Sequence, residues 1–68
     1  MEKNIKIDNM TCEHCSAKVE SALKSLEGVE DVKVSLFRKK ATVNGDHLDE
    51  NLLKEAIVNA GFDVISID

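Results

Sequence analysis

The chain has 68 residues, of which 43% are apolar and 32% charged, so one folded domain spanning residues 1–68 is expected. A domain of this size buries only about 60% of its unfolded surface, and a single pair of cysteines cannot supply a framework of disulfides. Acidic residues outnumber basic ones by 13 to 9, the net charge is −4, and no Trp or Tyr accompanies Phe37 and Phe62. This balance argues against nucleic acid as a partner, because nucleic-acid binding needs basic surfaces and stacking rings.

The sequence contains no apolar run long enough to cross a membrane, so direct membrane insertion is not expected. Its first residues, Met1 to Asn4, also lack the apolar stretch of a signal peptide. We therefore expect a cytosolic protein that begins at Met1, in a compartment where the two thiols stay reduced.

The first third of the chain predicts a strand followed by a helix. Residues 3–8 alternate between polar and apolar, as a half-buried strand requires. Over residues 13–26 the period becomes helical, with Thr11 as the expected N-cap and Gly28 as the left-handed stop. One face of this predicted helix is apolar and carries Cys15, Val19, Ala22, Leu23 and Leu26.

The middle of the chain predicts a hairpin and then a second helix. Alternating runs over residues 32–37 and 41–43 are separated by the basic segment 38–40, which forms the expected turn. Asp49 is the expected cap of a helix that extends to residue 60. The apolar stripe predicted for this helix consists of Leu52, Leu53, Ala56, Ile57 and Ala60.

The last elements complete a pattern that suggests one fold. Gly61 ends the second helix, and residues 62–67 predict a final strand. The order is strand, helix, strand, strand, helix, strand. With right-handed crossovers, this order predicts an α+β, ferredoxin-like βαββαβ sandwich, in which a four-stranded antiparallel sheet has both helices on one face.

The most informative stretch is residues 10–15, Met-Thr-Cys-Glu-His-Cys, which holds both cysteines of the chain. It lies where the first strand gives way to the first helix. Cys12 is then expected in the loop and Cys15 in the first helical turn, where the helix N-terminus stabilises a thiolate. Two converging thiolates suit a soft ion bound by two ligands, such as Cu(I) or Hg(II). A closed zinc site fits less well, because it needs about four ligands.

The same spacing also fits a redox dithiol, because thioredoxin-like enzymes place a Cys-x-x-Cys pair at a helix start. Those enzymes have a larger fold and a proline beside the active cysteines, whereas this chain contains no proline. Metal binding is therefore favoured over redox chemistry, and the strand-loop-helix context supports it.

Residues 10–15, the predicted element order and Gly61-Phe62 resemble the heavy-metal-associated domain of copper chaperones and copper-pumping ATPases. The resemblance covers essentially the whole chain, whose free-standing length is similar to that of a small bacterial copper chaperone. One departure is Asn9, where the family more often has glycine before the methionine. Since Asn also tolerates left-handed geometry, we interpret the difference as conservative.

The resemblance implies that Cys12 and Cys15 hold Cu(I) in near-linear or trigonal geometry. It further implies delivery to the metal-binding domain of a copper-transporting P-type ATPase by thiolate exchange, without catalysis. The expected exposure of the cysteine loop also predicts that copper can bridge two copies of the chain in a homodimer. The alternatives are an ATPase metal-binding domain itself or a mercury- or zinc-binding relative; Thr11 favours copper, because zinc pumps tend to have an acidic residue there. On the polar face of the first helix, Lys18 and Lys24 are candidate docking residues for an acidic partner.

Four further residues have expected roles other than metal binding. Met10 is expected to point into the core and tether the loop, and His14 is expected to face solvent. His47 is interpreted as a loop residue. Phe62 is expected to pack beside the metal loop and shield the sulfurs, whereas Phe37 carries no functional prediction.

Overall fold

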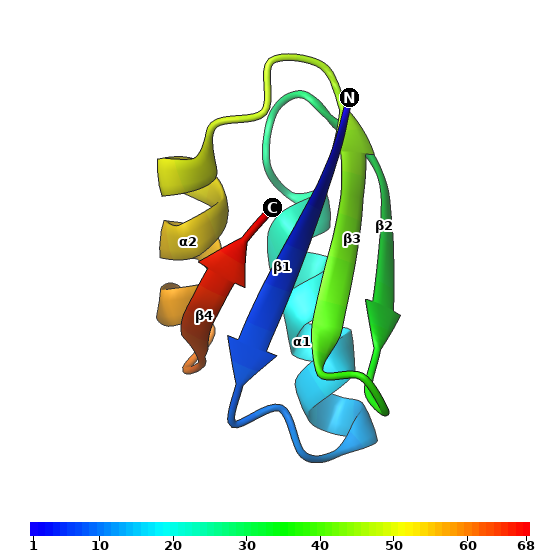
Figure 1. The fold of residues 1–68 in the computed structure, drawn as a ribbon, viewed down its shortest axis with the longest axis vertical. Helices are drawn as coiled ribbons and strands as arrows, with labels where there is room; N and C mark the ends of the chain where they lie inside the picture. The colour runs from blue at the N-terminus through cyan, green and yellow to red at the C-terminus, as the bar shows by residue number, and fades with distance from the viewer.

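The computed structural model of the protein describes residues 1–68 and contains the predicted order of elements (Figure 1). None of its helices has the length and apolar character needed to span a membrane. The elements are β1 (Glu2–Asp8), α1 (Glu13–Lys24), β2 (Val29–Ser35), β3 (Lys40–Gly45), α2 (Glu50–Asn59) and β4 (Asp63–Ile67).

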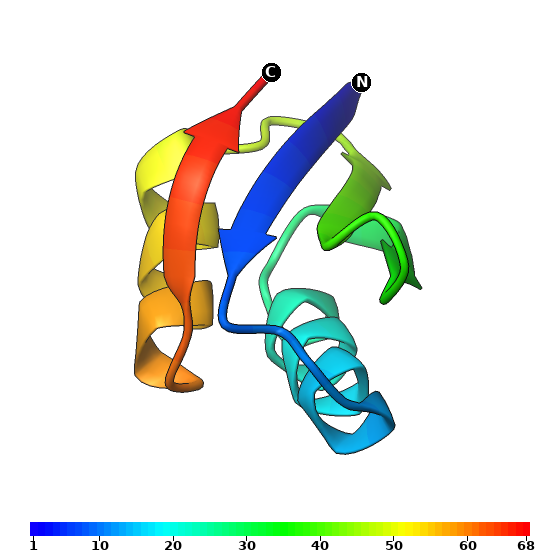
Figure 2. The same ribbon diagram turned by 60° about the horizontal axis from the view of Figure 1, so that its bottom comes forward.

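The four strands form one sheet in the order β2-β3-β1-β4, and every neighbouring pair is antiparallel. Both helices cover the same face of this sheet (Figures 1 and 2). The arrangement is the ferredoxin-like sandwich that the element order predicted. It brings the β1–α1 loop, the β2–β3 turn and the α2–β4 turn to one end of the molecule (Figure 1).

The core lies between the helices and the sheet. Alternate residues of β1 and β3 point inward, and each helix contributes a pair of residues four positions apart, as the sequence periods predicted. Full burial of each Val, Leu, Ile, Met or Phe side chain contributes about 1.5–3 kcal/mol to folding. The buried residues are Ile5, Ile7, Met10, Val19, Leu23, Val32, Ala41, Val43, Leu53, Ile57 and Phe62.

α1 begins at Glu13 as predicted, but its N-terminal cap and its C-terminal end differ from the prediction. Its N-cap is Cys12 and not Thr11, because the Cys12 carbonyl accepts the first helical hydrogen bond, from Ser16 N at 3.1 Å. No side chain caps this end. At the other end, Leu26 N donates to Leu23 O over three positions, so the last turn tightens and α1 ends at Lys24. Gly28 has the expected left-handed geometry (φ +89°), but it lies beyond the end of α1, whose C-cap is Ser25.

Two apolar side chains that the pattern placed in strand or core are exposed. Phe37 lies in the β2–β3 turn and is 96% exposed, because β2 ends at Ser35, whose Oγ accepts from Arg38 N at 3.2 Å. Leu52 is 48% exposed, because α2 turns Leu53 and the residue four positions later towards the sheet. The apolar stripe of α2 is therefore narrower than predicted.

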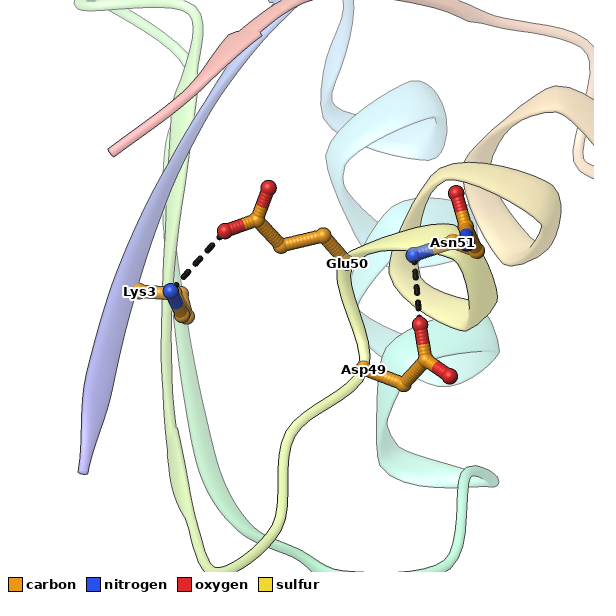
Figure 3. A network of polar contacts seen from close by, with 4 residues as sticks. All are labelled: Lys3, Asp49, Glu50 and Asn51. Carbon is orange, nitrogen blue, oxygen red and sulfur yellow. Dashed lines mark hydrogen bonds and ion pairs between the residues drawn. The ribbon is translucent and has the colours of Figure 1, made fainter.

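Side-chain contacts fix the start of α2. Asp49 caps it as predicted, with its Oδ1 accepting from Asn51 N at 2.8 Å (Figure 3). Glu50 in the first helical turn pairs with Lys3 of β1, with Nζ and Oε2 2.9 Å apart (Figure 3). A partly exposed ion pair of this kind contributes little stability, but it joins the helix to the sheet. Gly61, with φ +98°, ends α2 as expected.

Candidate metal centre

The two cysteines lie together at the start of α1. Cys12 is exposed and extended (φ −145°, ψ 167°), and Cys15 is half-buried in the first helical turn, where it packs against the core. Both thiols are free, and their Sγ atoms are 2.8 Å apart. Bonds from a thiolate to zinc are about 2.3 Å long, so two sulfurs up to about 4.6 Å apart can share an ion of similar size. The pair therefore has the reach to hold one soft metal ion.

Two features hold the loop that carries Cys12. Asn9 adopts left-handed geometry (φ +67°), as expected, and its backbone N donates to Asp8 Oδ1 at 3.0 Å. Its side-chain Nδ2 donates to Asp63 Oδ2 on β4 at 3.3 Å. Met10 is fully buried, which confirms that it tethers the loop to the core. The loop is thus anchored by a polar contact on one side and by an apolar one on the other.

The surroundings of Cys15 favour its thiolate. A hydrogen bond with the Cys12 thiol is the main cause that lowers the pKa of Cys15 from its ordinary value. The backbone N–H groups of Thr11 and Cys12 and the positive charge of Lys18 lower this pKa further, while partial burial opposes them. Since thiolates are the metal-binding form of cysteine, the lowered pKa favours binding of a soft ion by Cys15.

Other possible metal ligands stay apart from the cysteine pair. His14 is exposed, as predicted, and His47 lies in the β3–α2 loop with φ +54°. That loop is at the opposite end of the sheet from the β1–α1 loop (Figure 1). No three His, Cys, Asp or Glu side chains come together as a metal-binding group. A four-ligand structural zinc site is therefore not formed within the chain.

Phe62 occupies the α2–β4 turn, at the same end of the molecule as the cysteine loop (Figure 1). It belongs to the buried core and its backbone N donates to Ile57 O at 3.1 Å. Phe62 is therefore a core residue, and its packing beside the metal loop and shielding of the sulfurs stay predictions. The pattern of the sequence did not indicate the contact between Asn9 and Asp63, because it depends on the pairing of Asp8 with Asp63 across β1 and β4.

The fold and the dithiol loop define a small metal-binding module, and comparison with known proteins gives its family. Residues 4–63 match the model of the heavy-metal-associated domain, so the chain belongs to the heavy-metal-associated domain family. The copper chaperone CopZ of Staphylococcus epidermidis is 42% identical over 65 residues, which are 93% of this chain and 96% of that protein. A solved structure of a CopZ metallochaperone superposes with a TM-score of 0.91 at 31% identity, covering 96% of this chain and all of that one.

Longer proteins also contain a similar module. A probable copper-exporting P-type ATPase of Archaeoglobus fulgidus is 36% identical over 67 residues. These residues are 96% of this chain but only 8% of the ATPase. The chain thus matches nearly the full length of the chaperone and a small part of the transporter.

Proposed function

We propose that this protein is a cytosolic Cu(I) metallochaperone that delivers copper to a copper-transporting P-type ATPase. In this proposal Cys12 and Cys15 together bind one Cu(I) per chain. The observation that carries it is the pair of free thiols 2.8 Å apart, one on exposed Cys12 and one on half-buried Cys15, with no third ligand group beside them. Likeness to CopZ over nearly the whole length of both chains supports copper as the cargo.

Transfer by ligand exchange follows from the exposure of the site. A two-coordinate ion has room for a third sulfur, so a partner thiolate can form a bond to copper before the bond to exposed Cys12 breaks. In a second exchange, another thiolate of the partner replaces Cys15 on the copper ion. Each step forms one copper–sulfur bond and breaks another, so copper stays Cu(I). No catalytic group is needed, and the chaperone relatives support a carrier that is not an enzyme.

The same ligand exchange can also take place between two copies of this chain. A partner with its own cysteine pair, such as the metal-binding domain of the ATPase, meets the copper through the same exposed loop. A second copy of the chain offers the same two thiolates. We therefore include a transient copper-bridged homodimer, centred on Cys12 and Cys15, in the proposal.

The second candidate function is that of a metal-binding domain within a heavy-metal ATPase. The match to the Archaeoglobus fulgidus transporter favours it, since this chain resembles one small segment of that protein. Both candidates predict the same copper site and differ in the direction of transfer. Relative Cu(I) affinities of this chain and of a partner ATPase domain, measured with one competing chelator, distinguish donor from acceptor.

The experiment that tests the proposed cargo is a competition titration of the reduced protein with Cu(I), Zn(II) and Hg(II). We expect one Cu(I) per chain, two sulfur neighbours by X-ray absorption, and no displacement of Cu(I) by Zn(II). Cys12→Ser and Cys15→Ser should each largely abolish this binding, because one thiolate cannot replace a two-sulfur site. Full-strength binding by either serine variant, or fewer than two sulfur neighbours, would contradict the proposal. Displacement of Cu(I) by Zn(II) would point to a zinc-binding relative.

A further inference from the structure

The face of the sheet turned away from the helices carries a polar row that crosses all four strands. Antiparallel pairing sets Lys40 of β3 directly opposite Lys6 of β1. The same register continues to a serine on each side, so the row consists of Ser35, Lys40, Lys6 and Ser66. The buried neighbours of these lysines, Ile5 and Ala41, point to the helices, which leaves the lysines on the open face.

A cavity of about 230 Å³ lies over this row. Arg38 comes from the β2–β3 turn and reaches the same cavity, so cations from three separate segments line it. None of the lining residues is apolar. They are Asn4, Lys6, Arg38, Lys40, Ser66 and Asp68.

The three cations have no carboxylate partner within ion-pair distance. The two ion pairs of the structure, Lys3–Glu50 and Lys24–Glu20, involve other side chains. Like charges directly opposite one another on a sheet are destabilising, so the pairing of Lys6 with Lys40 opposes folding unless an anion neutralises it. On a chain with a net charge of −4, this local excess of positive charge stands out against the average surface.

We infer that this cavity is a binding site for a phosphate-type oxyanion. Lys6, Lys40 and Arg38 would supply charge-assisted hydrogen bonds, and the hydroxyl of Ser66 can donate another. The volume is below the roughly 300 Å³ at which pockets for organic ligands begin, and a wholly polar lining offers no surface to an apolar group. Asp68 opposes the anion, so its charge should limit the affinity.

The test is a titration of the reduced, copper-free protein with inorganic phosphate and diphosphate, followed by NMR, with chloride at matched ionic strength as reference. Saturable shifts are expected for amides of residues 4–6, 38–40 and 66–68. Lys6→Gln and Lys40→Gln should each weaken binding about tenfold, since a hydrogen bond to a charged group is worth about that factor. Asp68→Asn should strengthen it.

The matched control is Lys33→Gln. Lys33 is an exposed residue of the neighbouring strand β2 and its loss changes the net charge equally, but it does not line the cavity. The phosphate affinity of the Lys33→Gln variant should stay close to that of the unaltered protein. Equal weakening by Lys33→Gln would mean a general charge effect and would overturn the site. Shifts no larger than those with chloride would overturn it as well.

A second arm identifies the source of the oxyanion, either a soluble phosphate or the headgroup of a phospholipid. Vesicles of phosphatidylglycerol are compared with vesicles of phosphatidylcholine by co-sedimentation, using the unaltered protein and Phe37→Ser. Phe37 is 96% exposed and precedes Arg38 in the turn, so it can contact lipid beside a bound headgroup. Binding to phosphatidylglycerol that both Phe37→Ser and Lys40→Gln weaken assigns the lipid source. Binding of inorganic anions alone assigns a soluble one, and binding of neither refutes the site.

Discussion

The side-chain amide of Asn9 donates a 3.3 Å hydrogen bond to Asp63 Oδ2, although the two residues are 54 positions apart. Asp63 stands directly opposite Asp8 across β1 and β4, and Asn9 N donates to Asp8 as well. Asn9 therefore lies between two carboxylates that would otherwise repel each other. It also starts the loop that leads to Cys12, so this contact ties the candidate metal loop to the last strand.

Substitutions at Asn9 should separate the cost of its backbone geometry from the value of its hydrogen bond. Asn9→Gly keeps left-handed geometry without strain and loses the side-chain contact, so we expect a loss of stability of at most about 1 kcal/mol. Asn9→Ala should lose about 1–2 kcal/mol more, because Cβ is strained at φ +67°. Urea unfolding of the reduced protein measures both. Asp63→Asn is the control: it keeps an acceptor and removes the repulsion of Asp8, so it should not destabilise.

Met10 should act on stability and not as a copper ligand. Its side chain is fully buried, so Met10→Ala should lower the free energy of unfolding by about 2–5 kcal/mol. Met10→Leu conserves volume and removes the thioether, and should cost less than about 1.5 kcal/mol. Copper titration of Met10→Leu should give the stoichiometry and affinity of the unaltered protein. A large loss of copper affinity in this stable variant would assign Met10 to the metal.

His14→Ala should leave one Cu(I) per chain and change affinity only modestly, because this side chain is exposed and joins no group of metal ligands. Copper competition with a chelator at two pH values measures the effect and any change in proton release. Cys15→Ser shows how much copper affinity is lost when a ligand is removed. A comparable loss of affinity in His14→Ala would refute the prediction that His14 faces solvent and is not a ligand.

The lowered pKa of Cys15 predicts how pH acts on the reduced, metal-free protein. Because the folded state favours the thiolate, its contribution to stability is fully present above the unfolded pKa of about 8.5. It is lost as pH falls through the lower pKa of the folded state. The free energy of unfolding should thus rise with pH between these two values. Urea unfolding across this window should show a smaller rise for Cys15→Ser, and identical profiles would contradict the prediction.

The two candidate docking lysines of α1, Lys18 and Lys24, should contribute unequally to copper transfer. Lys24 Nζ lies 2.9 Å from Glu20 Oε1, and this hydrogen bond and charge raise the pKa of Lys24, while Lys18 takes part in no ion pair. The charge of Lys18 is therefore freer to attract an acidic partner. Stopped-flow transfer to a partner ATPase domain should slow by up to about tenfold at low salt for Lys18→Glu, and less for Lys24→Glu.

High salt should remove this difference, because screening weakens attraction between exposed charges. Lys54→Glu, on the exposed face of α2, reverses the same charge away from α1 and should transfer at the unaltered rate. If all three variants transfer alike, the lysines of α1 only solvate the helix. Complete interception of copper by a bulk chelator would instead refute transfer through a shared intermediate.

The sequence by itself determined the features that depend on neighbours along the chain. Alternation and helical spacing predicted the element order, and left-handed geometry was correctly expected at Asn9, Gly28 and Gly61. The Cys-x-x-Cys spacing at a strand-to-helix junction was enough to bring two sulfurs together at the start of α1. These features could be predicted because hydrogen bonds three or four residues apart, backbone sterics and side-chain period are local properties.

The tertiary structure decided what depends on register and on the exact end of each element. Pairing set Lys6 opposite Lys40 and Asp8 opposite Asp63, which no local pattern specifies, because register is a relation between distant segments. The early end of β2 exposed Phe37, and the first helical hydrogen bond made Cys12 the cap in place of Thr11. Local preference permits several end points, and packing of the whole sheet against two helices selects one of them.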